Sequence, residues 1–240
     1  MDNNQIYKGR LGIMVLDRKY LLVKGNAGRT DSYPFPTVSK VITGLYNPPT
    51  PPVYDGSGNL KHDAKKFMRC AFELQEMGVI AIISSCGFFC AMQEPASKIL
   101  KVPIYTSPLF LIPFVLSVIP STCKCGVVTL FRDVLYNGYL SYIVGNNTER
   151  IVLADMSQAF EFRRMIENDR ADVNESLLRK EVFNASVQLA RSDPSISALI
   201  MECSDMTPYS AAVRNAINIP VYDYTTLARM AYYSNGGYKY

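Results

Sequence analysis

One pattern of residues occurs twice in this chain, 117 positions apart, and this repeat constrains the fold more than any other feature. The first copy begins Ala81-Ile-Ile-Ser-Ser-Cys86, and the second begins Ala198-Leu-Ile-Met-Glu-Cys203. In each copy a stretch of helical character follows the cysteine, and a Pro-aliphatic-Tyr sequence begins 17 positions after it, at Pro103 and at Pro220. Because Ala, Ile, Cys, Pro and Tyr recur in register, we expect two related lobes.

Short runs rich in Val, Ile and Leu alternate with amphipathic stretches along the chain. Continuous apolar strands separated by helices are typical of parallel sheets covered on both faces. We therefore predict an α/β protein with two pseudo-symmetric lobes, each a mainly parallel, doubly wound sheet flanked by helices. The expected strands are 11–16, 39–45, 79–85, 103–106, 126–131, 150–156, 197–203 and 221–224, and the expected helices are 59–77, a segment after Cys86, 133–142, 157–168, 174–192 and 208–217.

Composition places the chain among ordinary globular proteins. With 240 residues, 48% of them hydrophobic and 19% charged, it can bury a full core. The net charge of +4 is spread over scattered Lys and Arg residues, so we expect no nucleic-acid partner. The uncharged segment 102–120 contains four prolines, which favours a buried strand and a core helix over a membrane span.

The cysteines are expected to be reduced thiols. The first five residues are polar and show no secretory pattern, so we expect a cytoplasmic protein in which its six cysteines do not form disulfides. A zinc site is not expected either, because structural zinc takes four ligands and His62 is the single histidine of the sequence.

Cys86 and Cys203 are the candidate catalytic residues because of their position. Each comes at the carboxyl end of a buried strand and before a helix, and ligands of open α/β sheets bind at that edge. Thr207 and Pro208 are predicted to be the N-cap and first residue of the second helix. Amides at a helix start favour an anion and lower the pKa of a nearby thiol, so a small carboxylate would suit this site.

Two equivalent thiols suggest proton transfer from both sides of one carbon. If the lobes face each other, one thiolate can remove a proton from a stereocentre while the other thiol returns one to the opposite face. A cysteine that ends a buried strand is also often a plain core residue, and the matched pair is the reason to prefer chemistry.

These residues resemble the aspartate/glutamate racemase superfamily, which includes cofactor-independent racemases, a maleate isomerase and an arylmalonate decarboxylase. The resemblance rests on Leu11-Gly-Ile-Met-Val-Leu-Asp17, Ser84-Ser-Cys-Gly-Phe88, Gly126-Val-Val-Thr129 and Glu202-Cys-Ser-Asp-Met-Thr-Pro-Tyr209. It implies an active site in an interlobal cleft, no cofactor, and a final helix that crosses back to the first lobe. The lobes would then comprise residues 1–107 plus 225–240, and residues 108–224.

The resemblance also implies the residues that hold a substrate carboxylate. They are Ser85, Gly87, Thr129, Ser204 and Asp205, to which we add Phe88 beside Cys86, and Asp17 and Asn26 from the segment after the first strand. Two of these, Asp17 and Asp205, have a plainer structural role open to them as caps of a turn or helix. Glu202, beside Cys203, is expected to be a structural carboxylate and not a base.

The match departs from amino-acid racemases at both cysteines, which leaves the substrate open. Gly87-Phe88 replaces the usual Asn-Thr, and Ser204-Asp205 replaces Thr followed by His or Glu, so the chain is closer to an under-characterised branch with a Cys-Gly-Phe loop. The leading hypothesis is a racemase or epimerase of a small carboxylate, such as an amino acid or derivative. The alternatives are a single-cysteine isomerase or decarboxylase of a diacid, and a two-lobed protein that binds a small anion without reacting.

The Tyr-rich tail, residues 232–240, is open to three interpretations. It packs on the first lobe, forms a homodimer contact, or makes no fixed contact.

Overall fold

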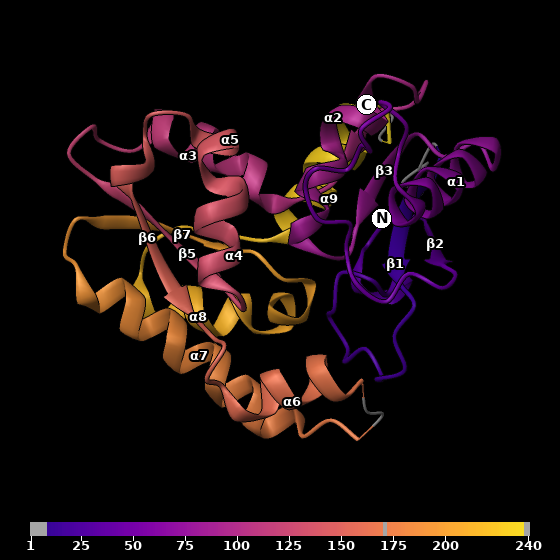
Figure 1. Ribbon diagram of the computed structural model, residues 1–240. Helices are drawn as coiled ribbons and strands as arrows, with labels where there is room; N and C mark the ends of the chain where they lie inside the picture. Colours follow the sequence, from indigo (N-terminus) through magenta and orange to yellow (C-terminus); the bar gives the residue numbers. More distant parts are fainter. Residues whose placement is uncertain (1–8, 170–171, 238–240) are drawn as a thin grey trace, which may run out of the picture. The chain divides into compact units, whose positions relative to one another are not determined.

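The computed structural model describes residues 9–169 and 172–237, which divide into two compact units (Figure 1). Unit 1 comprises the chain up to Asp17, Ala27–Ser107 and the chain from Thr225 onward, and unit 2 comprises Arg18–Asn26 and Pro108–Tyr224. Residues 18–26 therefore belong to unit 2 and not to the first lobe as predicted, because Tyr20 is buried in the apolar core of unit 2. The first five residues, and residues 238–240 of the Tyr-rich tail, lie outside the described residues.

Unit 1 contains a parallel four-stranded sheet in the order β2-β1-β3-β4. Its strands are β1 (Leu11–Leu16), β2 (Thr37–Ile42), β3 (Ala81–Ser84) and β4 (Ile104–Tyr105). The central strands β1 and β3 are almost entirely buried, as strands covered on both faces must be. β2 ends before the predicted 45, because Gly44 has a φ of +70° and Leu45 turns back to bond the Ile42 carbonyl.

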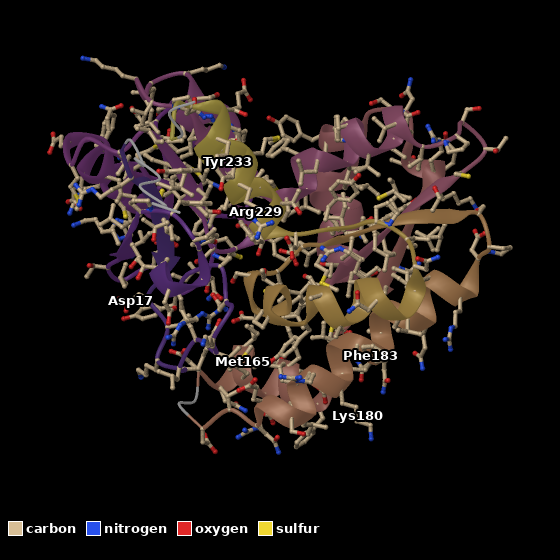
Figure 2. The ribbon with its side chains drawn as sticks, turned by 180° about the vertical axis from the view of Figure 1, so that it is seen from behind. Asp17, Met165, Lys180, Phe183, Arg229 and Tyr233 are labelled. Carbon is tan, nitrogen blue, oxygen red and sulfur yellow. The ribbon has the colours of Figure 1, made fainter. Side chains whose placement is uncertain are left out.

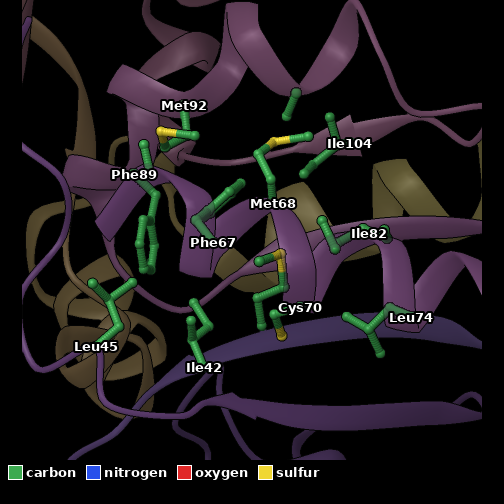
Figure 3. Close-up of a cluster of buried hydrophobic side chains, with 14 of the residues drawn as sticks. Ile42, Leu45, Phe67, Met68, Cys70, Leu74, Ile82, Phe89, Met92 and Ile104 are labelled. Atoms are coloured by element: carbon green, nitrogen blue, oxygen red, sulfur yellow. The ribbon is translucent and has the colours of Figure 1, made fainter. Parts of the chain in front are cut away.

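Alternate residues of this sheet pack into two different apolar clusters. Met14 and Ile82 join the cluster drawn in Figure 3. That cluster also contains the apolar side of α1 (His62–Glu76) and side chains from η2 (Gly87–Met92) and α2 (Gln93–Ser97). Phe67 of α1 and Phe89 of η2 meet there, with ring centroids 4.9 Å apart.

The second cluster of unit 1 includes α9 (Tyr224–Ser234). Ile13 and Ile83 pack against Ala228, Ala231 and Tyr232 of this helix. The Tyr232 ring stacks on Phe35, a residue that follows η1 (Thr30–Ser32), with centroids 4.1 Å apart and planes 5° from parallel. On α9, Arg229 and Tyr233 are exposed (Figure 2). The start of the Tyr-rich tail therefore packs in the core of unit 1.

Unit 2 repeats the same sheet in the order β6-β5-β7-β8, again with parallel pairs throughout. The strands are β5 (Lys124–Thr129), β6 (Ile151–Asp155), β7 (Ile196–Met201) and β8 (Val221–Tyr222). The helices are η3 (Pro108–Phe110), α3 (Leu111–Val118), α4 (Arg132–Leu135), the π-helix η4 (Tyr136–Leu140), α5 (Ser141–Val144), η5 (Thr148–Arg150), α6 (Phe160–Asn168), α7 (Glu175–Ser192), η6 (Ser204–Tyr209) and α8 (Ser210–Ile217).

The core of unit 2 lies between its sheet and helices α6, α7 and α8. Val128, Leu199 and Met201 of the strands belong to one cluster with side chains of all three helices. Met165 of α6 is buried in this cluster and Phe183 of α7 packs against it, whereas Lys180 of α7 points to solvent (Figure 2). Helix α3 also contacts β5 and β7.

The predicted duplication is confirmed by the strand pairing. β3 pairs Ile82 with Ile104, and β7 pairs Leu199 with Val221, which are the residues 117 positions further along. Each strand is then followed by a six-residue 3-10 helix at the corresponding place, η2 in unit 1 and η6 in unit 2. The two units therefore share strand order, register and the first helical turn after the third strand.

The segment 102–120 forms β4, η3 and α3, as expected from its prolines. Within residues 9–169 and 172–237, no helix has both the length and the apolar character that crossing a membrane requires.

One predicted helix start is wrong. Thr207 and Pro208 do not cap and open the helix after Cys203, because η6 already begins at Ser204 and contains both of them. The helix then continues as α8 from Ser210. A proline fixes φ near the value that a 3-10 helix needs, so Pro208 fits inside the turn where the sequence suggested a beginning.

Candidate functional site

In unit 1, Cys86 lies just beyond the carboxyl end of β3. Its backbone is extended, with φ −146° and ψ 127°, and η2 begins at the next residue, Gly87. The side chain is partly exposed. Ser85, Gly87 and Phe88, three of the predicted substrate-binding residues, flank it and are buried. The strand-loop-helix arrangement predicted for Cys86 is therefore present.

A group of polar side chains holds this loop against β4. Ser84 donates a short hydrogen bond from its hydroxyl to the Thr106 carbonyl. Gln93, at the start of α2, accepts from the Thr106 amide at 3.0 Å and from its hydroxyl at 2.9 Å, and donates to the Ile104 carbonyl at 2.8 Å. The ends of β3 and β4 are therefore fixed relative to the helical turn that follows Cys86.

Asp17 supports a turn in unit 1. Its carboxylate accepts the Gly44 amide at 2.7 Å, and its own amide donates to the Leu45 carbonyl at 2.9 Å. Of its two expected roles, the structure shows the cap of a turn, and the role in substrate binding stays a prediction.

In unit 2, Cys203 occupies the position equivalent to Cys86. It lies beyond the end of β7 with an extended backbone, φ −94° and ψ 142°, and η6 begins at Ser204. Cys203 is 8% exposed and Ser204 is buried. The Cys203 Sγ lies 3.6 Å from Oδ2 of Asp205, within reach of an S–H···O hydrogen bond.

Asp205 is the centre of a buried polar network in unit 2. Tyr20 donates its hydroxyl to Oδ2 at 3.0 Å, and Asn26 donates its side-chain amide to Oδ1 at 2.6 Å. The structure thus brings together three predicted site residues, because Asn26 reaches Asp205 and its neighbour Cys203 from 179 positions earlier in the sequence.

The protonation of this network depends on two opposing effects. Burial raises the pKa of the Asp205 carboxyl above its ordinary value. The hydrogen bonds from Tyr20 and Cys203, the charge of Arg18 and the hydrogen bond from Asn26 all oppose that rise. Burial also raises the pKa of Tyr20 well above its ordinary value, and the negative charge of Asp205 adds to the effect. Tyr20 is therefore a neutral donor at physiological pH.

Thr129 and Glu202 form a separate pair at the edge of the same sheet. Thr129, at the end of β5, donates its hydroxyl to Glu202 Oε2 at 3.2 Å, and both side chains are buried. Glu202 is thus a buried, hydrogen-bonded carboxylate, as its position beside Cys203 suggested. The Thr129 hydroxyl thus has a structural partner in Glu202. The predicted substrate-binding role of Thr129 stays a prediction.

Three of the four remaining cysteines are buried in the protein core. Cys90 is fully buried. Burial raises the pKa of Cys70 and of Cys125 to about 12. Cys123 is partly exposed, and none of the six cysteines, all of which lie in the described residues, forms a disulfide. Over the described part of the chain, no three His, Cys, Asp or Glu side chains gather as a metal ion would require.

Solved structures of low sequence identity share this architecture. Allantoin racemase from Klebsiella pneumoniae matches with a TM-score of 0.62 and 15% identity, over 96% of this chain and 90% of that one. Unliganded arylmalonate decarboxylase gives 0.57 and 15%, over 96% and 94%. The aspartate racemase of Picrophilus torridus gives 0.54 and 14%, over 95% of each chain. The chain has the aspartate/glutamate racemase fold. At these identities the likeness concerns the fold alone.

The sequence relatives are named for a different activity from that of the racemases. Dimethylsulfoniopropionate lyase of Durusdinium sp. clade D is 26% identical over 219 residues, covering 89% of this chain and 70% of that protein. Dimethylsulfoniopropionate lyase 6 of Emiliania huxleyi is 27% identical over 225 residues, covering 90% of this chain and 57% of that protein. The chain thus spans little more than half the length of the Emiliania huxleyi relative. No family model matches the chain. These relatives and the matched structures are named as enzymes.

Sequence reasoning missed Tyr20. The segment that carries it connects β1 to β2. Local sequence patterns predict this segment only as an ordinary loop of the first lobe. One signal was available: the connection between the two strands, residues 17–36, is much longer than the few residues usual in α/β proteins, and long connections are often functional.

Proposed function

We propose that this chain is a lyase that removes the proton next to a carboxylate and expels a neutral group from the neighbouring carbon, with dimethylsulfoniopropionate as its substrate. The observation that carries the proposal is the lyase name shared by relatives matched over about nine tenths of the chain. A thiol at the carboxyl end of the third strand of each sheet supplies the groups for such chemistry.

The chemistry of this substrate class suits a thiolate. Dimethylsulfoniopropionate carries a carboxylate at one end and a sulfonium on the β-carbon. A base takes the α-proton, the electron pair of that C–H bond forms a double bond, and the Cβ–S pair leaves with sulfur as dimethyl sulfide, giving acrylate. Because dimethyl sulfide leaves as a neutral molecule, the step needs a base and no acid. A thiol with a reference pKa of about 8.5 is ionised to a useful extent near neutral pH.

We assign proton removal to one member of the cysteine pair and carboxylate binding to the turns that follow the two cysteines. Gly87 and Ser204 open 3-10 helices. The first amides of a helix have no partner within the helix itself, and such amides favour an anion. Ser85 and Ser204 add hydroxyl donors.

The test is dimethyl sulfide release by the purified full-length chain, measured in the headspace by gas chromatography. Replacing the base by serine should lower kcat at least about 100-fold, because a serine hydroxyl is far less acidic than a thiol. Cys86→Ser and Cys203→Ser are compared with Cys123→Ser, which changes a partly exposed thiol elsewhere and should keep the activity of the unmodified chain. Release that is undetectable in the unmodified chain, or equal in all three variants, would refute the proposal.

The equivalent positions of Cys86 and Cys203 favour one second candidate, two-base racemisation of a small carboxylate. This reaction requires an acid as well as a base, and a matched pair of thiols provides both. In deuterated water, a racemase would place deuterium on the α-carbon of a chiral substrate, whereas the lyase would form acrylate from dimethylsulfoniopropionate. Deuterium incorporation without elimination would replace the first proposal by this one.

A further inference from the structure

The segment Arg18–Asn26 is fixed to unit 2 along its length. Near its start, Arg18 donates to the Ile166 carbonyl at 3.0 Å, and the Lys19 amide donates to the Asp169 carboxylate at 2.8 Å. Near its end, Gly25 adopts a φ of +91°, and a Cβ at this position would lie 3.3 Å from the Cα of Pro208 in η6. The segment therefore packs directly on the helical turn that follows Cys203.

With the segment packed in this way, two buried side chains donate hydrogen bonds to the Asp205 carboxylate. Tyr20 is 7% exposed and Asn26 is 0% exposed, and they donate to different oxygens of Asp205, which is itself 3% exposed. With Cys203, three donors converge on the two oxygens. An ionised carboxylate accepts from all of them, whereas a protonated one would have to give up an acceptor site to its own proton. The donor set therefore favours ionised Asp205 against the effect of burial.

In its ionised form, Asp205 acts on the neighbouring thiol. A thiol can donate to Oδ2 over the observed 3.6 Å, but a thiolate there would face a second negative charge in a buried site. Cys203 and Cys86 otherwise sit in equivalent places, each before a 3-10 helix. Asp205 distinguishes Cys203, because the corresponding position after Cys86 is Phe88.

We propose that Tyr20 and Asn26 are positioning residues which, through Asp205, hold Cys203 as a thiol at neutral pH, so that Cys203 delivers protons and does not remove them. When it acts, the S–H proton goes to a carbanion carbon, the S–H electron pair stays on sulfur, and the thiolate regains a proton from water. An elimination needs no such step, so in the proposed lyase reaction proton removal falls to Cys86. This catalytic part rests on the proposed function, whereas the protonation state of Cys203 can be measured without it.

Several other groups of unit 2 bear on this state. Arg18 contributes a positive charge that favours ionised Asp205. Burial raises the pKa of Tyr209, on the same 3-10 helix, and the negative charges of Glu175 and Asp205 add to the rise, so Tyr209 is neutral in the range of the experiment. Within the described residues, the Tyr209 hydroxyl has no hydrogen-bond partner.

The test is the rate at which iodoacetamide alkylates Cys203 between pH 6 and 10, measured on the full-length chain by mass spectrometry of the Cys203 peptide. The plateau at high pH reports access to the thiol, and the midpoint reports its ionisation. We expect a midpoint above the reference value for cysteine in the unmodified chain. In Asp205→Asn the midpoint should fall by about one pH unit or more, which is about a tenfold faster reaction at pH 7.

Tyr20→Phe provides the second variant, which matters if Asp205→Asn does not fold. The Tyr20 hydrogen bond is one of the interactions that lower the pKa of Asp205, so its loss makes the ionised carboxylate less favoured, and the Cys203 midpoint should lie between those of Asp205→Asn and the unmodified chain. Tyr209→Phe is the matched control, because it removes a buried hydroxyl from the same helix without touching the network, and its midpoint should not move. A Cys203 midpoint below pH 7 in the unmodified chain, or one unchanged by both Asp205→Asn and Tyr20→Phe, would overturn the inference. These readings do not depend on dimethyl sulfide release, so a failure of the proposed function would be recognised separately.

Discussion

At the scale of single residues, burial sorts the cysteines of this chain into different chemical types. Cys70 lies in the core of unit 1 and Cys125 in a central strand of unit 2, and burial raises the pKa of each to about 12. Cys86 is partly exposed at a helix start. Residues of one kind thus range from inert core side chains to a candidate base.

This difference predicts the order of thiol modification. At pH 9 a thiol with a pKa of about 12 is ionised in about one molecule in a thousand, so Cys70 and Cys125 should stay unmodified in the native protein while Cys86 reacts. Peptide mapping after timed iodoacetamide treatment measures this order, and treatment in denaturant shows that each peptide can be detected. Early modification of Cys125 in the native protein would show that this thiol is accessible to the reagent, and would contradict the prediction.

At the scale of elements, two connecting segments of unit 2 are held by specific contacts. One is the segment 18–26, which packs on η6, and the other is the turn between α7 and β7. In that turn, Asp193 accepts the amide and hydroxyl of Ser195 at 2.9 and 2.6 Å and pairs with Lys124 of β5 at 2.9 Å. The first connection depends on the positive φ of Gly25, and the second depends on the charge of Asp193.

Gly25→Ala tests the first connection. A side chain at a φ of +91° is strained, and its Cβ would press on the Pro208 backbone, so we expect a loss of about 1–2 kcal/mol in the free energy of unfolding. Urea denaturation followed by circular dichroism measures it. Gly56→Ala is the control, because a Cβ there meets nothing within 4 Å, and its effect should be within about 0.5 kcal/mol of zero. Equal effects of the two changes would mean that the segment is not held as described.

Asp193→Asn tests the second connection through pH. Hydrogen bonds from Ser195 and the interaction with Lys124 lower the pKa of Asp193 from 3.8 to about 2. The stabilisation from the ionised form is thus present above about pH 4 and is lost as the pH falls through 2. The variant should lack this part of the acid-induced fall in melting temperature between pH 4 and 2, and Ser195→Ala should lose part of it. An unchanged pH dependence in Asp193→Asn would contradict the assignment.

At the scale of the whole molecule, the chain passes repeatedly from one unit to the other. Unit 1 is built from three separate stretches and unit 2 from two. The last stretch brings α9 into the core of unit 1, where Tyr232 is fully buried against Phe35. The stability of unit 1 therefore depends on residues at the far end of the sequence.

Tyr232→Ala measures that dependence. Removing a fully buried aromatic ring should cost about 3–5 kcal/mol in the free energy of unfolding. Arg229→Ala, on the exposed side of the same helix, is the control and should change the stability little (Figure 2). Both are measured by urea denaturation of the full chain. A loss below about 1 kcal/mol for Tyr232→Ala would mean that α9 adds little to this core.

Local patterns predicted much of the fold, and long-range contacts account for what they missed. The apolar runs and the repeated cysteines predicted the parallel sheets and the turns after β3 and β7, because strand burial and helix starts depend on neighbouring residues. Tyr20 could not be found in this way, since its partner Asp205 lies 185 positions further along and nothing local marks the pair. The helix start at Thr207 was misplaced because proline suits a 3-10 turn as well as the first turn of an α-helix.

The segment 18–26 also makes the two copies of the duplicated frame unequal. After β1 the chain enters the other unit, whereas after β5 it goes into helix α4 of its own unit. Two units that share one fold can thus differ in function. The residues around the cysteine change in one unit, while those around the cysteine of the other unit stay the same. Relatives in which this segment differs would then be expected to differ in reaction type before they differ in architecture.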